Sequence, residues 1–139
     1  MKRFLFFLVF CFTFYLQAET YNFAHLDNTQ GLSNNQIERV FKDSRGFMWI
    51  GTNFGLNRYD GYHVKVYKSI KNDSTSLIYN AVYRIQEDKN RNLWITGNPR
   101  YAIYNVLTEK FDRDVLTYLA PYGIHFIPAL VEIDSKKNF

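Results

Sequence analysis

Residues 32–66 read LSNNQIERVFKDSRGFMWIGTNFGLNRYDGYHVKV, and residues 77–111 read LIYNAVYRIQEDKNRNLWITGNPRYAIYNVLTEKF, which is the same pattern 45 positions later without a gap. Nine of these 35 aligned positions are identical: Leu32/Leu77, Asn35/Asn80, Arg39/Arg84, Asp43/Asp88, Trp49/Trp94, Ile50/Ile95, Asn53/Asn98, Tyr59/Tyr104 and Lys65/Lys110. The two tryptophans of the chain therefore lie one period apart. A fixed period of about 40 to 45 residues is typical of the repeated blade of a β-propeller.

Short strand-like segments alternate with turn-forming residues inside each period. The segments are rich in β-branched and aromatic residues, which favour strands, and clusters of Gly, Asp and Asn separate them. In the first repeat the predicted strands are 37–42, 47–52, 56–60 and 63–67. Four short antiparallel strands make one propeller blade. The sequence therefore predicts an all-β fold, a β-propeller fragment built of four-stranded antiparallel blades.

Weaker matches extend the repeat in both directions. Residues 129–139 resemble 83–93 at a shift of 46, and residues 21–37 resemble 66–82 with two residues fewer. We therefore expect a strand at 21–26 that closes the ring of a propeller, and a longer protein of which this sequence is the N-terminal piece. The predicted boundaries are 1–18 for a signal peptide, 19–31 for the N-terminal strand of an incomplete blade, 32–76 for the first blade, 77–122 for the second blade and 123–139 for the truncated start of a third blade.

Residues 1–18 have the layout of a secretory signal peptide. Lys2 and Arg3 precede an apolar run of about 13 residues, and Ala18 supplies a small residue at the expected cleavage point. The run is shorter than the roughly 20 residues that a membrane-spanning helix needs. A transmembrane anchor and a lipoprotein acylated at Cys11 are the alternatives. Cleavage after Ala18 predicts an exported, periplasmic protein.

The composition narrows the classes of partner. Cys11 is the only cysteine, so a chain cleaved after Ala18 has no disulfide framework and no thiol chemistry. The net charge of +4 includes Lys2 and Arg3, so the mature chain is only weakly basic. Without a basic cluster, nucleic-acid binding by this segment is not predicted.

Two residue types recur at fixed places in the repeat. Asp43, Asp88 and Asp134 follow the first predicted strand of each repeat, where an Asp side chain suits a tight turn. The alternative for these acids is calcium ligation, which needs several clustered oxygen ligands. Trp49 and Trp94 recur among apolar neighbours, which predicts packing between blades. Stacking on a sugar is the alternative for these two indoles.

The glycines of the first repeat also predict turn geometry. Gly46 and Gly55 are expected to have positive φ angles, which glycine adopts without steric cost. The second repeat has Arg91 and Arg100 at these places. We therefore expect the turns of the second blade to differ from those of the first.

No catalytic, cofactor-binding or metal-binding residue is predicted. Propellers also host glycosidases and lyases, which use paired carboxylates, and the candidates here are the pairs Glu87/Asp88 and Asp112/Asp114. Neighbouring strand residues point to opposite faces, and acids in turns are usually solvated. The histidines His25, His63 and His125 lack metal-ligand spacing. No cofactor is expected, and this segment is not predicted to be an enzyme.

The first repeat contains Asp-x-x-Gly-x-x-Trp-Ile-Gly-Thr at 43–52, followed by Gly-Leu-Asn-Arg-Tyr-Asp-Gly at 55–61. This pattern resembles the regulator-propeller repeat of two-component systems, clearly over 21–111 and more loosely over 112–139. The second repeat departs from it. Thr96-Gly97 replaces Gly-Thr, and Arg100-Tyr101-Ala102 replaces Gly-Leu-Asn.

The resemblance implies the periplasmic sensor region of a bacterial hybrid two-component histidine kinase that controls polysaccharide use through a phosphorelay. Such proteins bind oligosaccharides released from complex glycans and act as dimers, with the rest of the propeller and the kinase modules beyond these residues. The motif specifies the fold and not the ligand contacts, so the ligand-binding residues are unknown from sequence. A secreted propeller enzyme or binding module acting on polysaccharides, and a non-functional truncated product, are the alternatives.

Overall fold

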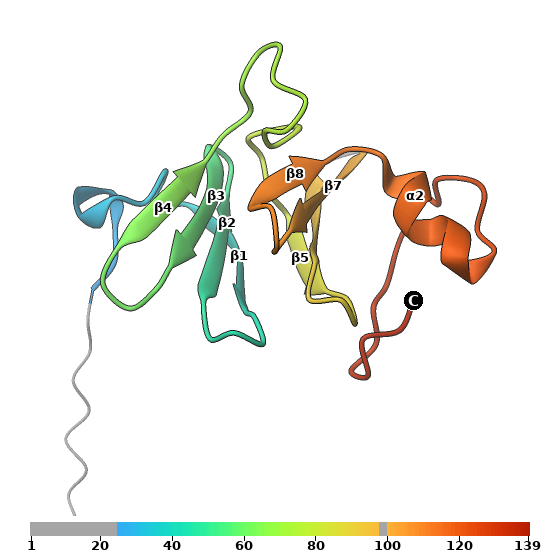
Figure 1. The fold of residues 1–139 in the computed structure, drawn as a ribbon. Helices are drawn as coiled ribbons and strands as arrows, with labels where there is room; N and C mark the ends of the chain where they lie inside the picture. The colour runs from blue at the N-terminus through green and yellow to red at the C-terminus, as the bar shows by residue number, and fades with distance from the viewer. Residues whose placement is uncertain (1–24, 98–99) are drawn as a thin grey trace, which may run out of the picture.

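The computed structural model describes residues 25–97 and 100–139, which form two neighbouring four-stranded sheets (Figure 1). The first sheet holds, in spatial order, β1 (Ile37–Lys42), β2 (Met48–Thr52), β3 (Gly55–Tyr59) and β4 (Val64–Tyr67). The second holds β5 (Arg84–Glu87), β6 (Leu93–Gly97), β7 (Arg100–Asn105) and β8 (Lys110–Asp112). All neighbouring strands are antiparallel. The predicted fold class is confirmed.

The predicted strands of the first blade agree with the observed strands to within one residue at each end. Asp60 ends the third strand because its carboxylate accepts hydrogen bonds from the backbone N–H groups of Tyr62, at 2.8 Å, and His63, at 2.7 Å. Asn57 is fully buried and donates to the carbonyl oxygen of Ile50 at 2.9 Å. Much of the Gly-Leu-Asn-Arg-Tyr-Asp-Gly motif therefore serves the fold.

The strand register decides which side chains meet the neighbouring sheet. Trp49 pairs with Phe41 on one side and with Arg58 on the other, and directly paired residues share a face of a sheet. This face meets Tyr104 and Phe111 of the second sheet in one apolar cluster. The main core of the described chain therefore lies between the two sheets.

Gly51 of the first sheet packs tightly against Val82, in the segment that leads into the second blade. A β-carbon at Gly51 would lie 2.7 Å from Cγ1 of Val82, which is too close for any residue but glycine. The backbone N–H of Val82 donates to the carbonyl oxygen of Thr52 at 2.9 Å, and this bond joins the entry of the second blade to the first. The Gly-Thr pair of the first repeat is thus required by the contact between blades.

A second apolar cluster covers the far face of the second sheet. It contains Trp94 and Tyr101 from the sheet, and Val115 and Leu119 from the short helix α2 (Val115–Leu119). A single 3-10 turn, η3 (Ala120–Tyr122), follows this helix. The repeat did not predict these helical turns within 77–122, because the matching part of the first repeat is a loop.

The start of the third repeat differs from the prediction. Residues 123–139 contain no strand, although the repeat predicts one near 129–134. A strand needs hydrogen bonds to a neighbour, and the structure describes no partner strand beside this segment. Val131 nevertheless packs into the second cluster.

The N-terminal predictions fall mostly outside the described residues. The predicted signal peptide at 1–18 lies wholly outside them, and so does most of the predicted strand at 21–26. His25 and Leu26 are not part of a strand, and the 3-10 turn η2 (Asn28–Gln30) follows, capped by Asp27. Within 25–97 and 100–139, no helix is long and apolar enough to cross a membrane.

Candidate functional site

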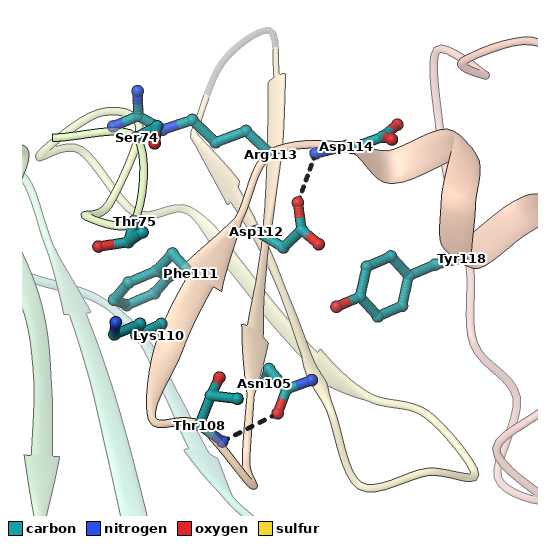
Figure 2. Close-up of a pocket in the computed structure, with 10 residues that line it drawn as sticks. All are labelled: Ser74, Thr75, Asn105, Thr108, Lys110, Phe111, Asp112, Arg113, Asp114 and Tyr118. Carbon is teal, nitrogen blue, oxygen red and sulfur yellow. Dashed lines mark hydrogen bonds between the residues drawn. The ribbon is translucent and has the colours of Figure 1, made fainter. Parts of the chain in front are cut away.

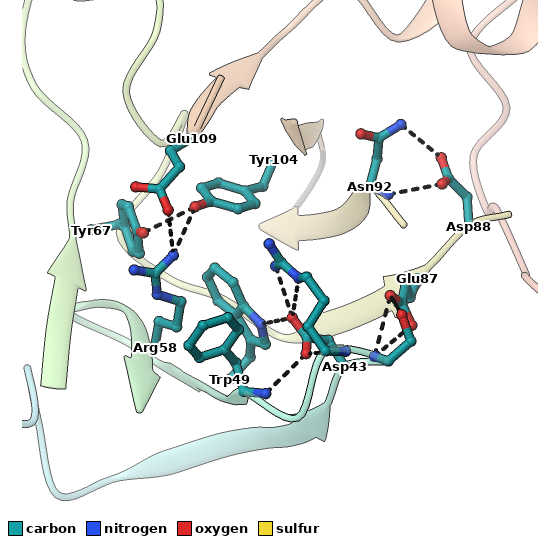
Figure 3. Close-up of polar contacts among 12 residues, drawn as sticks. Asp43, Trp49, Arg58, Tyr67, Glu87, Asp88, Asn92, Tyr104 and Glu109 are labelled. Carbon is teal, nitrogen blue, oxygen red and sulfur yellow. Dashed lines mark hydrogen bonds and ion pairs between the residues drawn. The ribbon is translucent and has the colours of Figure 1, made fainter. Parts of the chain in front are cut away.

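The recurring aspartate organises the turn between the first two strands of each blade (Figure 3). One carboxylate oxygen of Asp43 accepts from the backbone N–H groups of Arg45, at 2.9 Å, and Phe47, at 3.0 Å. The other accepts from the indole N–H of Trp49, at 2.9 Å, and pairs with the Arg45 guanidinium at 2.8 Å. Burial alone would raise the pKa of Asp43, but these hydrogen bonds and the charge of Arg45 outweigh it and lower the pKa.

The same contacts recur in the second and third repeats. Asp88 accepts from the indole N–H of Trp94 at 3.0 Å and from the backbone N–H of Asn92 at 2.9 Å. Asp134 accepts from the backbone N–H of Asn138 at 2.8 Å. The interpretation of these acids as turn residues is confirmed. Their oxygens face N–H donors, and the described residues hold no group of three or more His, Cys, Asp or Glu that could bind a metal ion.

The backbone of this turn corrects one expectation from the sequence. Gly46 has a φ angle of +96°, as predicted, and Gly55 has +148°. Arg91 and Lys137 occupy the place of Gly46 in the later repeats and have φ angles of 65° and 64°. The prediction that this turn differs in the second blade is therefore wrong. The hydrogen bonds to the aspartate hold even a non-glycine residue in the left-handed region.

Both tryptophans are core residues. Trp49 has an exposed fraction of 0% and Trp94 of 1%. The Trp49 ring lies 5.0 Å from that of Tyr104 in the second blade, and the Trp94 ring lies 4.8 Å from that of Phe139. The predicted packing between blades is confirmed for Trp49, whereas the C-terminal segment and α2 cover Trp94. Neither indole is available as a platform for a sugar.

A polar bridge that the sequence did not reveal joins the three turns. Glu87 is buried, with an exposed fraction of 6%, and accepts from the hydroxyl of Ser44 at 2.5 Å and from its backbone N–H at 3.1 Å. The ammonium group of Lys137 donates to the same carboxylate at 2.6 Å. A contact between residues 43 and 50 positions apart depends on how the blades stack, so no local pattern predicts it.

A second polar cluster lies at the outer edge of the blade interface (Figure 3). Arg58 donates to Glu109 at 2.9 Å and to the hydroxyl of Tyr104 at 3.2 Å, and Lys65 donates to Glu109 at 3.1 Å. Hydrogen bonds from Arg58 and Lys65 lower the pKa of Glu109 to about 2. The hydroxyls of Tyr67 and Tyr104 lie 3.2 Å apart, and burial raises the pKa of both. These contacts hold the outer strands of the two blades together.

The structure separates most of the remaining candidate residues. His25 contacts Asp27, and His63 lies 3.8 Å from Asp60. Both contacts are local, and His125 is not part of a metal-binding group among the described residues. Glu87 and Asp88 face different partners, Glu87 the neighbouring turns and Asp88 its own turn.

The pair Asp112/Asp114 is brought to one cavity of about 500 Å³, beside Asn105, Lys110 and Tyr118 (Figure 2). Asp112 accepts from the backbone N–H of Asp114 at 2.8 Å, and Asp114 accepts from Thr117 at 2.8 Å. Each carboxylate is thus engaged close to its own backbone. The pair does not present two free carboxylates across a cleft, as glycoside hydrolysis requires.

A larger cavity of about 610 Å³ lies where three connecting segments meet. Ile78 and Tyr79 come from the link between β4 and β5, Arg100 and Tyr101 from the start of β7, and Arg113 from the residue after β8. We name it the Tyr79–Arg113 cavity. Its volume is in the range of about 300 to 1,000 Å³ that is usual for small-molecule sites, so it is the candidate functional site of the described chain.

Comparison with known proteins agrees with the repeat. Residues 31–54 and 76–98 match the two component regulator propeller family, and each matched segment holds one Asp–Trp turn. The chain carries two-component regulator propeller repeats. The matched segments end before β3 and β7, so the family pattern covers the first two strands of each blade and leaves the Tyr79–Arg113 cavity partly outside it.

A histidine kinase is among the similar proteins. The chain is 38% identical over 64 residues to Histidine kinase P4 of Formosa agariphila, which covers 45% of this chain and 5% of that protein.

Two solved extracellular domains from B. thetaiotaomicron are also similar. BT3049, named as a hybrid two-component system, is 32% identical with a TM-score of 0.58, over 65% of this chain and 13% of that one. BT4673 is named as a one-component system in one structure and as a hybrid two-component system in another. The first of these structures is 31% identical with a TM-score of 0.52, over 66% of this chain and 13% of the BT4673 chain. The chain spans 13% or less of the length of these relatives. Its two sheets match part of their propellers.

Proposed function

We propose that this chain contributes two blades to the extracellular sensor propeller of a two-component histidine kinase, and that the whole protein responds to an oligosaccharide released from a complex glycan. One observation carries the proposal. The Asp–Trp turn recurs one period apart inside the two segments that match the regulator propeller family, and the same blades superimpose on extracellular domains of two-component systems.

The geometry supports a role in binding rather than in catalysis. The acids at the turns are engaged by N–H donors, whereas the Tyr79–Arg113 cavity is an open space lined by aromatic and apolar side chains and by two arginines. Loops between strands carry function when a rigid scaffold positions them. The bridge of Ser44, Glu87 and Lys137 supplies that rigidity, because it ties the turns of consecutive repeats to one another.

The remaining parts of the proposal concern the whole protein. Export with cleavage after Ala18 is proposed from the layout of residues 1–18, and dimerisation from the resemblance of the repeat to the regulator-propeller family. The likeness to Histidine kinase P4 and the hybrid systems supports transfer of the signal through a kinase and a phosphorelay. The oligosaccharide ligand follows from the resemblance of the repeat to sensors of polysaccharide use.

The test is made in the bacterium that carries the gene. We would delete the codons for residues 32–122 in frame, grow the strain on a set of purified polysaccharides, and measure transcript levels of its polysaccharide-degrading enzymes. The response to at least one glycan should disappear. A deletion strain that responds to every glycan as the parent does would refute the proposal.

Two point variants test whether the response depends on the packed core of these blades. Trp49→Ala should abolish the response because it opens the core between the blades, whereas Tyr62→Ala, at a side chain with an exposed fraction of 88%, should leave it intact. The enzyme alternative is tested on the purified protein by the release of reducing ends from the same polysaccharides. Release that Trp49→Ala abolishes would favour the enzyme.

A further inference from the structure

We infer that the Tyr79–Arg113 cavity is an anion-selective subsite for an oligosaccharide that carries carboxylate or sulfate groups. The inference rests on the proposed function as a glycan sensor and assigns its ligand a chemical class. The cavity brings together two arginines, Arg100 and Arg113, and two tyrosines, Tyr79 and Tyr101, against apolar walls from Ile78 and Val115.

The shape and lining fit a small ligand. Binding cavities are mostly apolar and aromatic, with a few polar groups that fix the orientation of the ligand. Val115 is buried and forms one wall, while Tyr79 has an exposed fraction of 40% and offers an accessible ring. An aromatic ring packs on the apolar face of a sugar, and its polar tip stays available for hydrogen bonds.

Tyr101 has a different role from Tyr79. Its exposed fraction is 3%, and its hydroxyl accepts from the backbone N–H of Val131 at 2.8 Å and donates to the carbonyl oxygen of Ala129 at 3.3 Å. Tyr101 therefore ties the C-terminal segment to β7 and fixes one side of the cavity. This leaves Tyr79 as the aromatic contact for a ligand.

The charge of the lining decides the ligand class. Arg100 and Arg113 are its only charged residues, and neither forms an ion pair with a described carboxylate. By contrast, Arg45, Arg58 and Arg84 each pair with an acid. Two guanidinium groups without a direct ion pair in one cavity favour an anion, and the planar fork of arginine matches carboxylate and sulfate oxygens.

Arg113 is held in place by neutral groups. Its Nη2 donates to the carbonyl oxygens of Asp73 at 2.9 Å, Ser76 at 3.1 Å and Leu77 at 3.2 Å. These acceptors orient the guanidinium without neutralising it. Arg113 also lines the neighbouring cavity that holds Asp112 and Asp114, but these two carboxylates are engaged by local donors. The charge of Arg113 helps to lower the pKa of Asp73, without a direct ion pair. Arg113 therefore adds positive charge to the Tyr79–Arg113 cavity, and Arg100 is the charged group there that a ligand can reach.

The experiment measures affinity on the protein produced from its own gene and purified from the bacterial envelope. Isothermal titration calorimetry would compare three probes of equal length: trigalacturonate, which carries carboxylates, galactotriose, its neutral counterpart, and sulfated galactotriose. We expect one of the two anionic probes to bind at least about tenfold more tightly than galactotriose, the difference that one charge-assisted hydrogen bond supplies. The tighter of the two identifies the anionic group.

The variants locate the site. Arg100→Gln should weaken binding of the preferred anion about tenfold, because Arg100 is exposed and its charge has no described partner. Tyr79→Ala should weaken all three probes. Arg39→Gln removes the same charge from an exposed residue outside the cavity and should leave affinity unchanged. Circular dichroism of each variant checks that it is folded. Arg113 is not replaced, because its hydrogen bonds support the loop at residues 73–77.

The outcomes separate this inference from the proposed function. Equal affinity for galactotriose and both anions, or an unchanged affinity in Arg100→Gln, would overturn the inference while leaving a glycan sensor in place. Absence of binding to all three probes in a protein that still responds to glycans in the bacterium would also overturn the inference alone. Absence of both binding and response would overturn the inference and the proposed function together.

Discussion

Replacing Asp43 with alanine tests whether the recurring aspartate stabilises the blade. The change leaves the indole N–H of Trp49 without a hydrogen-bond acceptor, and Trp49 is fully buried. A buried unpaired donor costs about 1 to 3 kcal/mol. The backbone N–H groups of Arg45 and Phe47 also lose an acceptor. Ser44 and Gly46 of this turn are exposed, so water can replace the lost acceptor. Each of these two backbone hydrogen bonds therefore contributes about 0.5 kcal/mol or somewhat more. We expect Asp43→Ala to lower the free energy of unfolding by about 3 kcal/mol.

The third repeat supplies a matched control. Asp134 makes the same contacts to its own turn, including the backbone N–H of Asn138, but unlike Asp43 it is exposed. Asp134→Ala should therefore cost about 1 kcal/mol or less. The assay is urea unfolding of the purified protein, followed by tryptophan fluorescence and by circular dichroism. Equal losses in Asp43→Ala and Asp134→Ala would refute the reasoning, because burial of the indole bond would then contribute nothing.

A double-mutant cycle isolates the indole bond. Trp49→Phe keeps an aromatic ring in the core but removes the N–H donor along with part of the ring, and the cycle subtracts the cost of the lost ring volume. The cost of Asp43→Ala should therefore shrink by about 1 to 3 kcal/mol in this background. The pH dependence gives a second readout. The folded-state pKa of Asp43 lies below 3.8, so its contribution is present above that value and is lost as the pH falls through the folded pKa. Asp43→Asn should remove that part of the acid sensitivity.

Three further predictions concern the core, the blade edge and processing. Trp49→Ala should lower the free energy of unfolding by about 3 to 5 kcal/mol, the usual cost of truncating a large buried aromatic, and a loss below 1 kcal/mol in urea unfolding would contradict the packing described above. An NMR titration should give Glu109 a pKa of about 2. Arg58→Gln should raise that pKa toward the ordinary value of 4.5, and an unchanged pKa would show that the ion pair between Arg58 and Glu109 does not form in solution. Mass spectrometry of the exported protein should find a mature chain that starts directly after Ala18, and retention of Met1 would support an anchor instead.

Much of the fold could be predicted because its signals are local and repeated. The strands of the first blade follow from β-branched and aromatic segments separated by turn residues, and Asp43 and Asp88 recur because each satisfies a turn within six positions of itself. Burial of both tryptophans follows from their recurrence among apolar neighbours. Such features depend on neighbours along the chain, so a single sequence carries them.

The tertiary structure decided the features that depend on how blades stack. Arg91 adopts the left-handed backbone of Gly46 because the surrounding hydrogen bonds compensate for its side chain, and residues 123–139 contain no strand because a strand exists only beside a partner. Glu87 became a link between turns through contacts with Ser44 and Lys137. The candidate site had no signal in the sequence, since its lining comes from segments up to about 50 residues apart. Contacts of that span are set by the packing of one blade on the next, which the order of residues along the chain does not display.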